Sequence, residues 1–385
     1  MHIERTLAAI AIGLATLTPQ PASQDKCPAF TAAVNYPSGA APRWLVASDL
    51  NGDGRPDLVV ANQNSKNVSV LLANGNGTFA PAVNYSVGDT PLSVAIGDFN
   101  GDGKPDLAVA NYSSNDISIL LGNGSGAFAP AVNISASDSP FPIAVGDFNG
   151  DGKPDLAVTS ESSNNVSILL GNGNGTFAAR TAFGAGVSPG SIGVVDFNGD
   201  GKLDIAVGNR TSNNVSILMG NGNGTFAAAV NYPCAGSELR SLAVADTNGD
   251  GKPDLILGNG ASGNIAILRG NGDGTFATAI SLTAPGSHWS VAVGDFNSDG
   301  KLDIAAVNVF SNLSILLGNG NGTFAAPVNF AAGESPRYLV VGDFNGDGKS
   351  DLAVANGDFT VPSKNYASVL LNTCPSPPRH RSVRH

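Results

Sequence analysis

One nine-residue pattern recurs seven times along this 385-residue chain and constrains its fold more than any other feature. The copies begin 48 to 50 residues apart, and the second copy reads DFNGDGKPD. A fixed period of this length is typical of solenoids, arrays and propellers. The chain is therefore expected to repeat one small unit rather than to combine unrelated domains. The copies begin at Asp49, Asp98, Asp147, Asp196, Asp246, Asp295 and Asp343.

Each period contains four short apolar runs separated by clusters of Gly, Asn, Asp and Ser. In the second period these runs are SVAIG (93–97), DLAVA (106–110), ISILL (117–121) and FAPAVNI (128–134). Such runs indicate strands, and no sustained helical period is present. We therefore predict an all-β fold, a seven-bladed β-propeller of four-stranded antiparallel blades. A parallel β-helix is the alternative, but its coils repeat at a shorter period and need no hairpin turns.

The two ends of the repeat region complement each other. The seventh repeat stops after ASVLLN (367–372) and lacks a fourth strand, whereas FTAAVNY (30–36) matches FAPAVNY (79–85). An N-terminal strand that completes the last blade closes the ring and removes two exposed sheet edges. We therefore predict a single propeller domain over residues 29–372.

Cysteine placement fits the same closure. Aligned on the turn LLANGNGTF (71–79), Cys374 and Cys27 occupy adjoining positions of one hairpin turn, so we expect a disulfide between them. The alternative is two unrelated exposed thiols. Cys234 is left without a partner.

The nine-residue pattern, here called the Asp loop, supplies oxygen donors. Positions 1, 5 and 9 are Asp, position 3 is Asn, position 6 is Gly, and position 7 offers its backbone carbonyl. Ca²⁺ takes six to eight oxygens at about 2.3–2.6 Å, whereas Mg²⁺ demands a tighter octahedron. No Cys or His cluster suggests zinc. We predict up to seven Ca²⁺ sites, with these ligands: Asp49, Asn51, Asp53, Arg55, Asp57, Asp98, Asn100, Asp102, Lys104, Asp106, Asp147, Asn149, Asp151, Lys153, Asp155, Asp196, Asn198, Asp200, Lys202, Asp204, Asp246, Asn248, Asp250, Lys252, Asp254, Asp295, Asn297, Asp299, Lys301, Asp303, Asp343, Asn345, Asp347, Lys349 and Asp351.

The alternative interpretation of the loops is a row of Asx turns without metal. It explains Asn and Gly, but it leaves three like charges crowded together seven times. Of 31 acidic residues, 21 are loop aspartates, and seven Ca²⁺ ions would bring the formal net charge from −11 to +3. The acidity is thus explained by the predicted metal sites. The negative charge and a pI near 4.6 also disfavour binding to nucleic acid or to anionic membranes.

The loops, together with turns followed by Phe-Ala-Pro (79–81 and 128–130), resemble FG-GAP/VCBS repeats, which also build the head of integrin α subunits. The resemblance covers about residues 29–372. It implies a seven-bladed propeller with Ca²⁺ held between the first and second strands of the blades. Integrin α heads carry such loops in only some blades, whereas all seven are complete here. This regularity favours a structural repeat over a specialised receptor.

Residues that break the repeat are the candidates for function. One His (His288) and three Glu (Glu161, Glu238 and Glu334) lie in the repeat region, and no sequence pattern places a base beside a nucleophile. The start of each first strand is the most variable position, and both Trp residues fall there. These starts should share the face opposite the Asp loops, beside an insertion at 356–367. We predict a ligand site there, the mouth cluster: Arg43, Trp44, Trp289, Arg337 and Tyr338.

The mouth cluster has two interpretations. Its rings could stack on a protein or glycan ligand, or they could merely plug the channel mouth. We favour a non-catalytic, monomeric module for adhesion or ligand binding. The alternative function is a calcium-dependent polysaccharide lyase or hydrolase on a propeller scaffold.

The first residues are typical of an export signal. A 12-residue apolar stretch (6–17) follows a short polar start, and it is shorter than the roughly 20 residues that span a bilayer. We therefore expect residues 1–23 to be a signal peptide and the protein to be secreted, periplasmic or on the cell surface. The basic, Pro-rich tail (375–385) is expected to be disordered.

Overall fold

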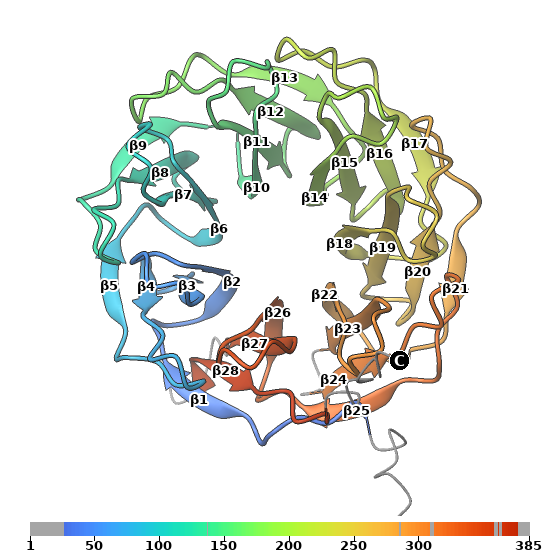
Figure 1. The fold of residues 1–385 in the computed structure, drawn as a ribbon. Helices are drawn as coiled ribbons and strands as arrows, with labels where there is room; N and C mark the ends of the chain where they lie inside the picture. The colour runs from blue at the N-terminus through green and yellow to red at the C-terminus, as the bar shows by residue number, and fades with distance from the viewer. Residues whose placement is uncertain are drawn as a thin grey trace, which may run out of the picture.

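The computed structural model describes residues 27–136, 138–284, 286–308, 312–357, 361 and 364–375. The expected signal peptide (1–23) and residues 376–385 of the tail lie outside this part. The described residues form 28 strands in seven four-stranded antiparallel sheets. The sheets stand around a ring like the blades of a propeller (Figure 1). The predicted fold class is confirmed.

Each blade runs outward from the centre of the ring, in chain order except in the last blade. The innermost strands are β2 (Pro42–Ser48), β6 (Pro91–Gly97), β10 (Pro140–Gly146), β14 (Pro189–Val195), β18 (Leu239–Ala245), β22 (His288–Gly294) and β26 (Pro336–Gly342). The second strands are β3 (Asp57–Asn62), β7 (Asp106–Asn111), β11 (Asp155–Ser160), β15 (Asp204–Asn209), β19 (Asp254–Asn259), β23 (Asp303–Asn308) and β27 (Asp351–Asn356).

The outer half of each blade is shorter. The third strands are β4 (Asn67–Leu71), β8 (Asp116–Leu120), β12 (Asn165–Leu169), β16 (Asn214–Leu218), β20 (Ile265–Leu268), β24 (Asn312–Leu316) and β28 (Tyr366–Leu370). The rim strands are β5 (Val83–Ser86), β9 (Val132–Ser135), β13 (Thr181–Gly184), β17 (Val230–Pro233), β21 (Ile280–Leu282), β25 (Val328–Ala331) and β1 (Val34–Pro37).

The core lies between neighbouring blades. Every residue of β7 is buried, as expected for a strand sandwiched between two other sheets. Phe99, at position 2 of the second Asp loop, is 1% exposed and packs near edge-on against Phe177 of the next blade, with ring centroids 5.6 Å apart. Its carbonyl accepts a hydrogen bond from the Gly175 N–H of that blade. Each Asp loop is thereby fixed at the junction of two blades.

The ring closes as the sequence predicts. Strand β1 pairs with β28, with Val34 opposite Val369, so the last sheet has the order β1-β28-β27-β26. The blue β1 lies beside the red β28 in Figure 1. Cys27 and Cys374 form a disulfide with their Cα atoms 5.6 Å apart, while Cys234 is a buried free thiol. Both the closure and the disulfide are confirmed.

Strand lengths differ from the expectation at two places. The run FAPAVNI forms a strand only from Val132, and Phe128 makes a single isolated bridge to Gly122. Pro130 has no N–H with which to continue the ladder, and Phe128 packs edge-on against Tyr85. The inner strands begin earlier than expected, because a bulge after their first residue extends the pairing. Over the described part of the chain, no helix is present that could cross a bilayer.

Candidate functional site

Each Asp loop connects an inner strand to the second strand of its blade. In the first loop Asp49 follows β2, and Asp57 begins β3. Gly52 and Gly54 have φ angles of +77° and +81°, a conformation that residues with a Cβ rarely adopt. These two glycines fold the backbone around the first side chain of the loop, so its N–H groups point inward.

The first aspartate receives those N–H groups. Gly52 donates to Oδ1 of Asp49 at 2.8 Å, and Gly54 donates to Oδ2 at 2.7 Å. Partial burial of this carboxylate opposes ionisation, but the N–H donors prevail and lower the pKa of Asp49. The bond from position 6 to Oδ2 recurs in every loop. Position 1 therefore organises the loop whether or not an ion is bound.

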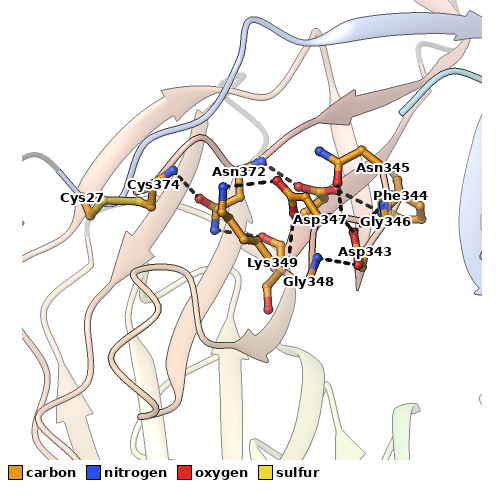
Figure 2. Close-up of polar contacts among 12 residues, drawn as sticks. Cys27, Asp343, Phe344, Asn345, Gly346, Asp347, Gly348, Lys349, Asn372 and Cys374 are labelled. Carbon is orange, nitrogen blue, oxygen red and sulfur yellow. Dashed lines mark hydrogen bonds and ion pairs between the residues drawn. A yellow bond between two sulfur atoms is a disulfide. The ribbon is translucent and has the colours of Figure 1, made fainter. Parts of the chain in front are cut away.

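The aspartate at the ninth position is buried and joins two backbone segments by accepting an N–H group from each. We call this pair of hydrogen bonds the backbone staple; the sequence did not predict it. Asp57 is fully buried; its Oδ2 accepts the N–H of Leu50 at 3.0 Å, and its Oδ1 accepts the N–H of Ala73 at 2.7 Å. The staple joins the start of the loop to the hairpin turn after the third strand. Equivalent bonds occur at Asp106, Asp155, Asp204, Asp254, Asp303 and Asp351. Figure 2 shows the seventh loop, with Asp343, Asp347 and Gly348, near the Cys27–Cys374 disulfide.

The aspartate at the fifth position is exposed and forms an ion pair with the Lys or Arg side chain of position 7. In the second loop Oδ2 of Asp102 lies 3.4 Å from Nζ of Lys104, the residue at position 7. Exposed pairs of this kind contribute little to stability. The same pair forms at Asp53–Arg55, Asp151–Lys153, Asp200–Lys202, Asp299–Lys301 and Asp347–Lys349.

The Asp loops suit a hard cation in their chemistry. As they stand, no three His, Cys, Asp or Glu side chains within the described ranges are arranged to hold an ion. The donor set is nevertheless all oxygen, and the carboxylates of positions 5 and 9 have lone pairs beyond those that accept N–H groups. Burial raises the pKa of Asp57, its two N–H donors lower it, and the charges of Asp53 and Asp49 raise it again. The three carboxylates of a loop are thus close enough to repel one another, and a cation would relieve that repulsion.

The mouth cluster lies at the opposite ends of the inner strands. Its residues come from β2, β22 and β26, and all five line one pocket. The ring of Trp44 stacks on that of Tyr338 with centroids 3.7 Å apart, and Phe141 meets Trp44 edge-on at 5.6 Å. The aromatic pair forms one wall of the pocket.

Guanidinium groups gather around the second Trp. The guanidinium carbons of Arg43, Arg240 and Arg337 lie 4.7, 4.1 and 4.3 Å from the ring centroid of Trp289. Each distance is within range of a cation–π interaction. Burial, followed by the charges of Arg337 and Arg240, lowers the pKa of Arg43 to about 9, so it remains protonated at neutral pH.

Twelve residues that line this pocket were not among the predicted ligands, and four of them are aromatic or charged. Phe141 and Arg240 start inner strands, whereas Glu161 and Arg210 follow the second strands and pair with each other at 2.5 Å. The position after the second strand also varies between repeats, being Gln63, Tyr112, Glu161, Arg210 and Gly260 in successive blades. Comparing this position between the repeats would have identified Glu161 and Arg210 as candidates. Of the insertion at 356–367, residues 358–360 and 362–363 lie outside the described part, while the Gly357 carbonyl accepts Nε of Arg337 at 3.3 Å.

Family comparisons agree with the repeat. The FG-GAP-like repeat matches residues 49–109, 98–158, 147–207, 196–257, 246–306 and 295–354, and the FG-GAP repeat matches residues 339–370. No curated protein matches the chain.

Several solved structures share the fold at low identity. BBS1N, in complex with ARL6DN, is 14% identical, with a TM-score of 0.62 over 91% of this chain and 99% of that one. A lectin of Agrocybe aegerita, which recognises non-reducing terminal N-acetylglucosamine, is 20% identical, with a TM-score of 0.57 over 86% of each chain. The virginiamycin B lyase of Staphylococcus aureus is 11% identical, with a TM-score of 0.60 over 89% of this chain and 100% of that one. At these identities the likeness concerns the fold alone.

Proposed function

Because the chain belongs to the FG-GAP-like repeat family, we propose that it is an exported, non-catalytic propeller that binds a protein or glycan ligand at the mouth cluster. Propellers of this family serve as ligand-binding or adhesion modules, which is the starting point of the proposal. The Asp loops are its structural side, and the mouth cluster is its binding side.

One observation carries the binding role. The five residues that depart from the repeat at the strand starts line a single pocket. Aromatic and Arg side chains are the common anchors of interfaces, and flat rings also stack on sugars. A plug alone would need apolar filling, whereas this pocket gathers four guanidinium groups.

Calcium is proposed for the Asp loops. In each loop the carboxylates of positions 1, 5 and 9, the Asn oxygen of position 3 and the carbonyl of position 7 would hold it. Bound Ca²⁺ would neutralise the clustered carboxylates. Because the loops sit where neighbouring blades meet, an ion there would stabilise the ring rather than take part in binding.

Export as a monomer is the third element of the proposal. The apolar stretch near the start of the sequence supports export, and so does the disulfide, because disulfides persist in oxidising compartments. The acidic net charge supports a ligand other than nucleic acid.

The candidate acid and base groups support a non-catalytic role over the lyase or hydrolase alternative. Glu161 of the pocket is paired with Arg210, and His288 is fully buried with Nε2 donating to the Ala284 carbonyl. Neither side chain stands ready to take a proton from a ligand.

A screen of immobilised glycans and candidate protein ligands, with and without Ca²⁺, tests the binding role. We expect Trp44→Ala to abolish binding of the ligand found while leaving calcium stoichiometry unchanged. Trp44→Phe, which keeps an aromatic face against Tyr338, should retain part of the affinity. A ligand whose affinity ignores every residue of the mouth cluster would place the site elsewhere.

A further inference from the structure

Positive charge accumulates at the mouth of a protein that is otherwise strongly acidic. The formal net charge of the chain is −11, yet four Arg and one Glu line this pocket. Glu161 is engaged by Arg210, and Arg240 pairs with Glu238 at the pocket edge. The excess cations are therefore concentrated around the Trp289 ring.

Arg43 is the residue whose charge is least compensated. Its guanidinium makes no hydrogen bond or ion pair with any described residue, and it lies over the face of Trp289. Arg43 itself is half-buried, whereas Nε of the neighbouring Arg240 is buried without a hydrogen-bond partner among the described residues. A buried donor without an acceptor costs about 1–3 kcal/mol, and more when it is charged.

Three guanidinium groups around one ring also repel one another. A cation–π contact offsets about 0.5–2 kcal/mol for each, but it supplies no negative charge and no acceptor for the N–H donors. An anion here would add the missing negative charge and would accept N–H donors of Arg43 and the unpartnered Nε of Arg240. Planar guanidinium groups suit carboxylate, sulfate and phosphate oxygens, to which they can donate two hydrogen bonds at once.

We propose that the mouth cluster binds the carboxylate or sulfate group of an acidic saccharide, with Arg43 as its principal partner. This inference rests on the proposed ligand-binding function and names the chemical class of the ligand. The enclosed space is about 90 Å³, enough for one compact anionic group but far below the roughly 300 Å³ of a pocket that engulfs a small molecule. The rest of the ligand lies outside this space, and Trp44, which lines the same pocket, supplies an aromatic side chain against which a sugar ring can pack.

Trigalacturonic acid and its methyl ester make a matched pair of probes, because esterification removes the negative charges and adds only methyl groups. By isothermal titration calorimetry, we expect the acid to bind at least about tenfold more tightly than the ester. This is the fold-change expected for hydrogen bonds to a charged group. Arg43→Gln should remove that preference, so that the acid binds no more tightly than the ester does. Arg180→Gln, on the outer rim away from the pocket, should bind like the wild type.

Stability provides a second readout. Since Arg43 lies among like charges, Arg43→Gln should melt at the wild-type temperature or higher in the absence of anions. Inorganic sulfate should stabilise the wild type more than chloride does at equal ionic strength, and the variant should lose this difference. If the variant fails to fold, competition of sulfate against trigalacturonic acid on the wild type decides the question, and sulfate is expected to compete.

Equal binding of acid and ester, or failure of sulfate to compete, would overturn the inference. A neutral ligand that needs Trp44 but ignores Arg43→Gln would leave the proposed function standing and this inference wrong. A peptide with a terminal carboxylate that binds through Arg43, when acidic saccharides do not, would overturn the saccharide assignment. Absence of any ligand that depends on the mouth cluster would remove both.

Discussion

At the scale of single residues, the ninth aspartate of each Asp loop combines two demands. Asp106 is fully buried and accepts the N–H groups of Phe99 and Gly122, so it holds the blade together without any ion. Asp102 is exposed and makes only local contacts with its own loop. The two carboxylates of one loop should therefore respond differently to substitution.

Asp106→Asn is expected to destabilise the protein even in chelator. The amide would place an N–H₂ against one of two backbone N–H groups, leaving buried donors unsatisfied at a cost of about 1–3 kcal/mol. Asp102→Asn is the matched control, and it should leave the free energy of unfolding in EDTA unchanged while weakening the stabilisation by Ca²⁺. Urea denaturation with and without EDTA measures both. If both variants lost the same free energy of unfolding in EDTA, the metal-independent structural role of Asp106 would be refuted.

His288 gives the protein a predictable response to pH. Burial lowers the pKa of His288 from 6.5, so the folded state binds its proton less readily than the unfolded chain. The contribution of neutral His288 to the free energy of unfolding is therefore complete above about pH 6.5. It is lost as the pH falls toward the pKa of His288 in the folded state. Leu239 occupies the same place in the preceding blade, so His288→Leu should fit there. This variant should lose less stability than the wild type as the pH falls. Denaturation midpoints between pH 7 and 5 that fall equally in both proteins would count against it.

At the scale of elements, the last blade is the one assembled from both sides of the sequence. Strand β1 pairs with β28, and the disulfide joins residues separated by 347 positions. A cross-link over such a loop restricts the unfolded chain, by on the order of 5 kcal/mol in the chain-entropy model. The other six blades have a continuous hairpin turn at this place, so they need no such cross-link.

Cys27→Ser with Cys374→Ser should open the last blade first. Hydrogen exchange in β28 is expected to accelerate toward that of an edge strand, while the equivalent strand β8 stays protected. Cys234→Ala is the control, because Ala136 and Ala185 occupy the same place in other blades. Uniform acceleration across all blades would show that the ring unfolds as one unit and that the disulfide has no local role.

How much of this the sequence could predict depends on which residues repeat. The period, the loop pattern and the matching runs at 30–36 and 79–85 predicted the blades, the closure and the disulfide. The backbone staple at Asp57 was missed, because an Asp that binds an ion and an Asp that accepts N–H groups occupy the same position in a sequence. Arg210 and Glu161 were missed because only the strand starts were compared, although the column after the second strands reaches the same pocket.

At the scale of the whole molecule, the proposed function gives the two ends of the inner strands separate roles. One end leads into the Asp loops, which sit at the junctions between blades, and the other end carries the mouth cluster. An inner strand of seven residues spans about 20 Å, so an ion in a loop and a ligand at the mouth would not touch. Calcium should then act on stability, and the mouth residues should act on binding.

Scanning calorimetry of the wild type and of Trp44→Ala, each with 1 mM Ca²⁺ and with EDTA, tests that division most directly. For affinities of about 10⁻⁴–10⁻³ M, each filled loop contributes roughly 0.4–1.4 kcal/mol, so several loops together should raise the melting temperature markedly. We predict that EDTA lowers the melting temperature by the same amount in both proteins. An unchanged melt in EDTA, with no calcium bound, would contradict the proposed metal loops; a different shift in Trp44→Ala would contradict the separation of the two faces.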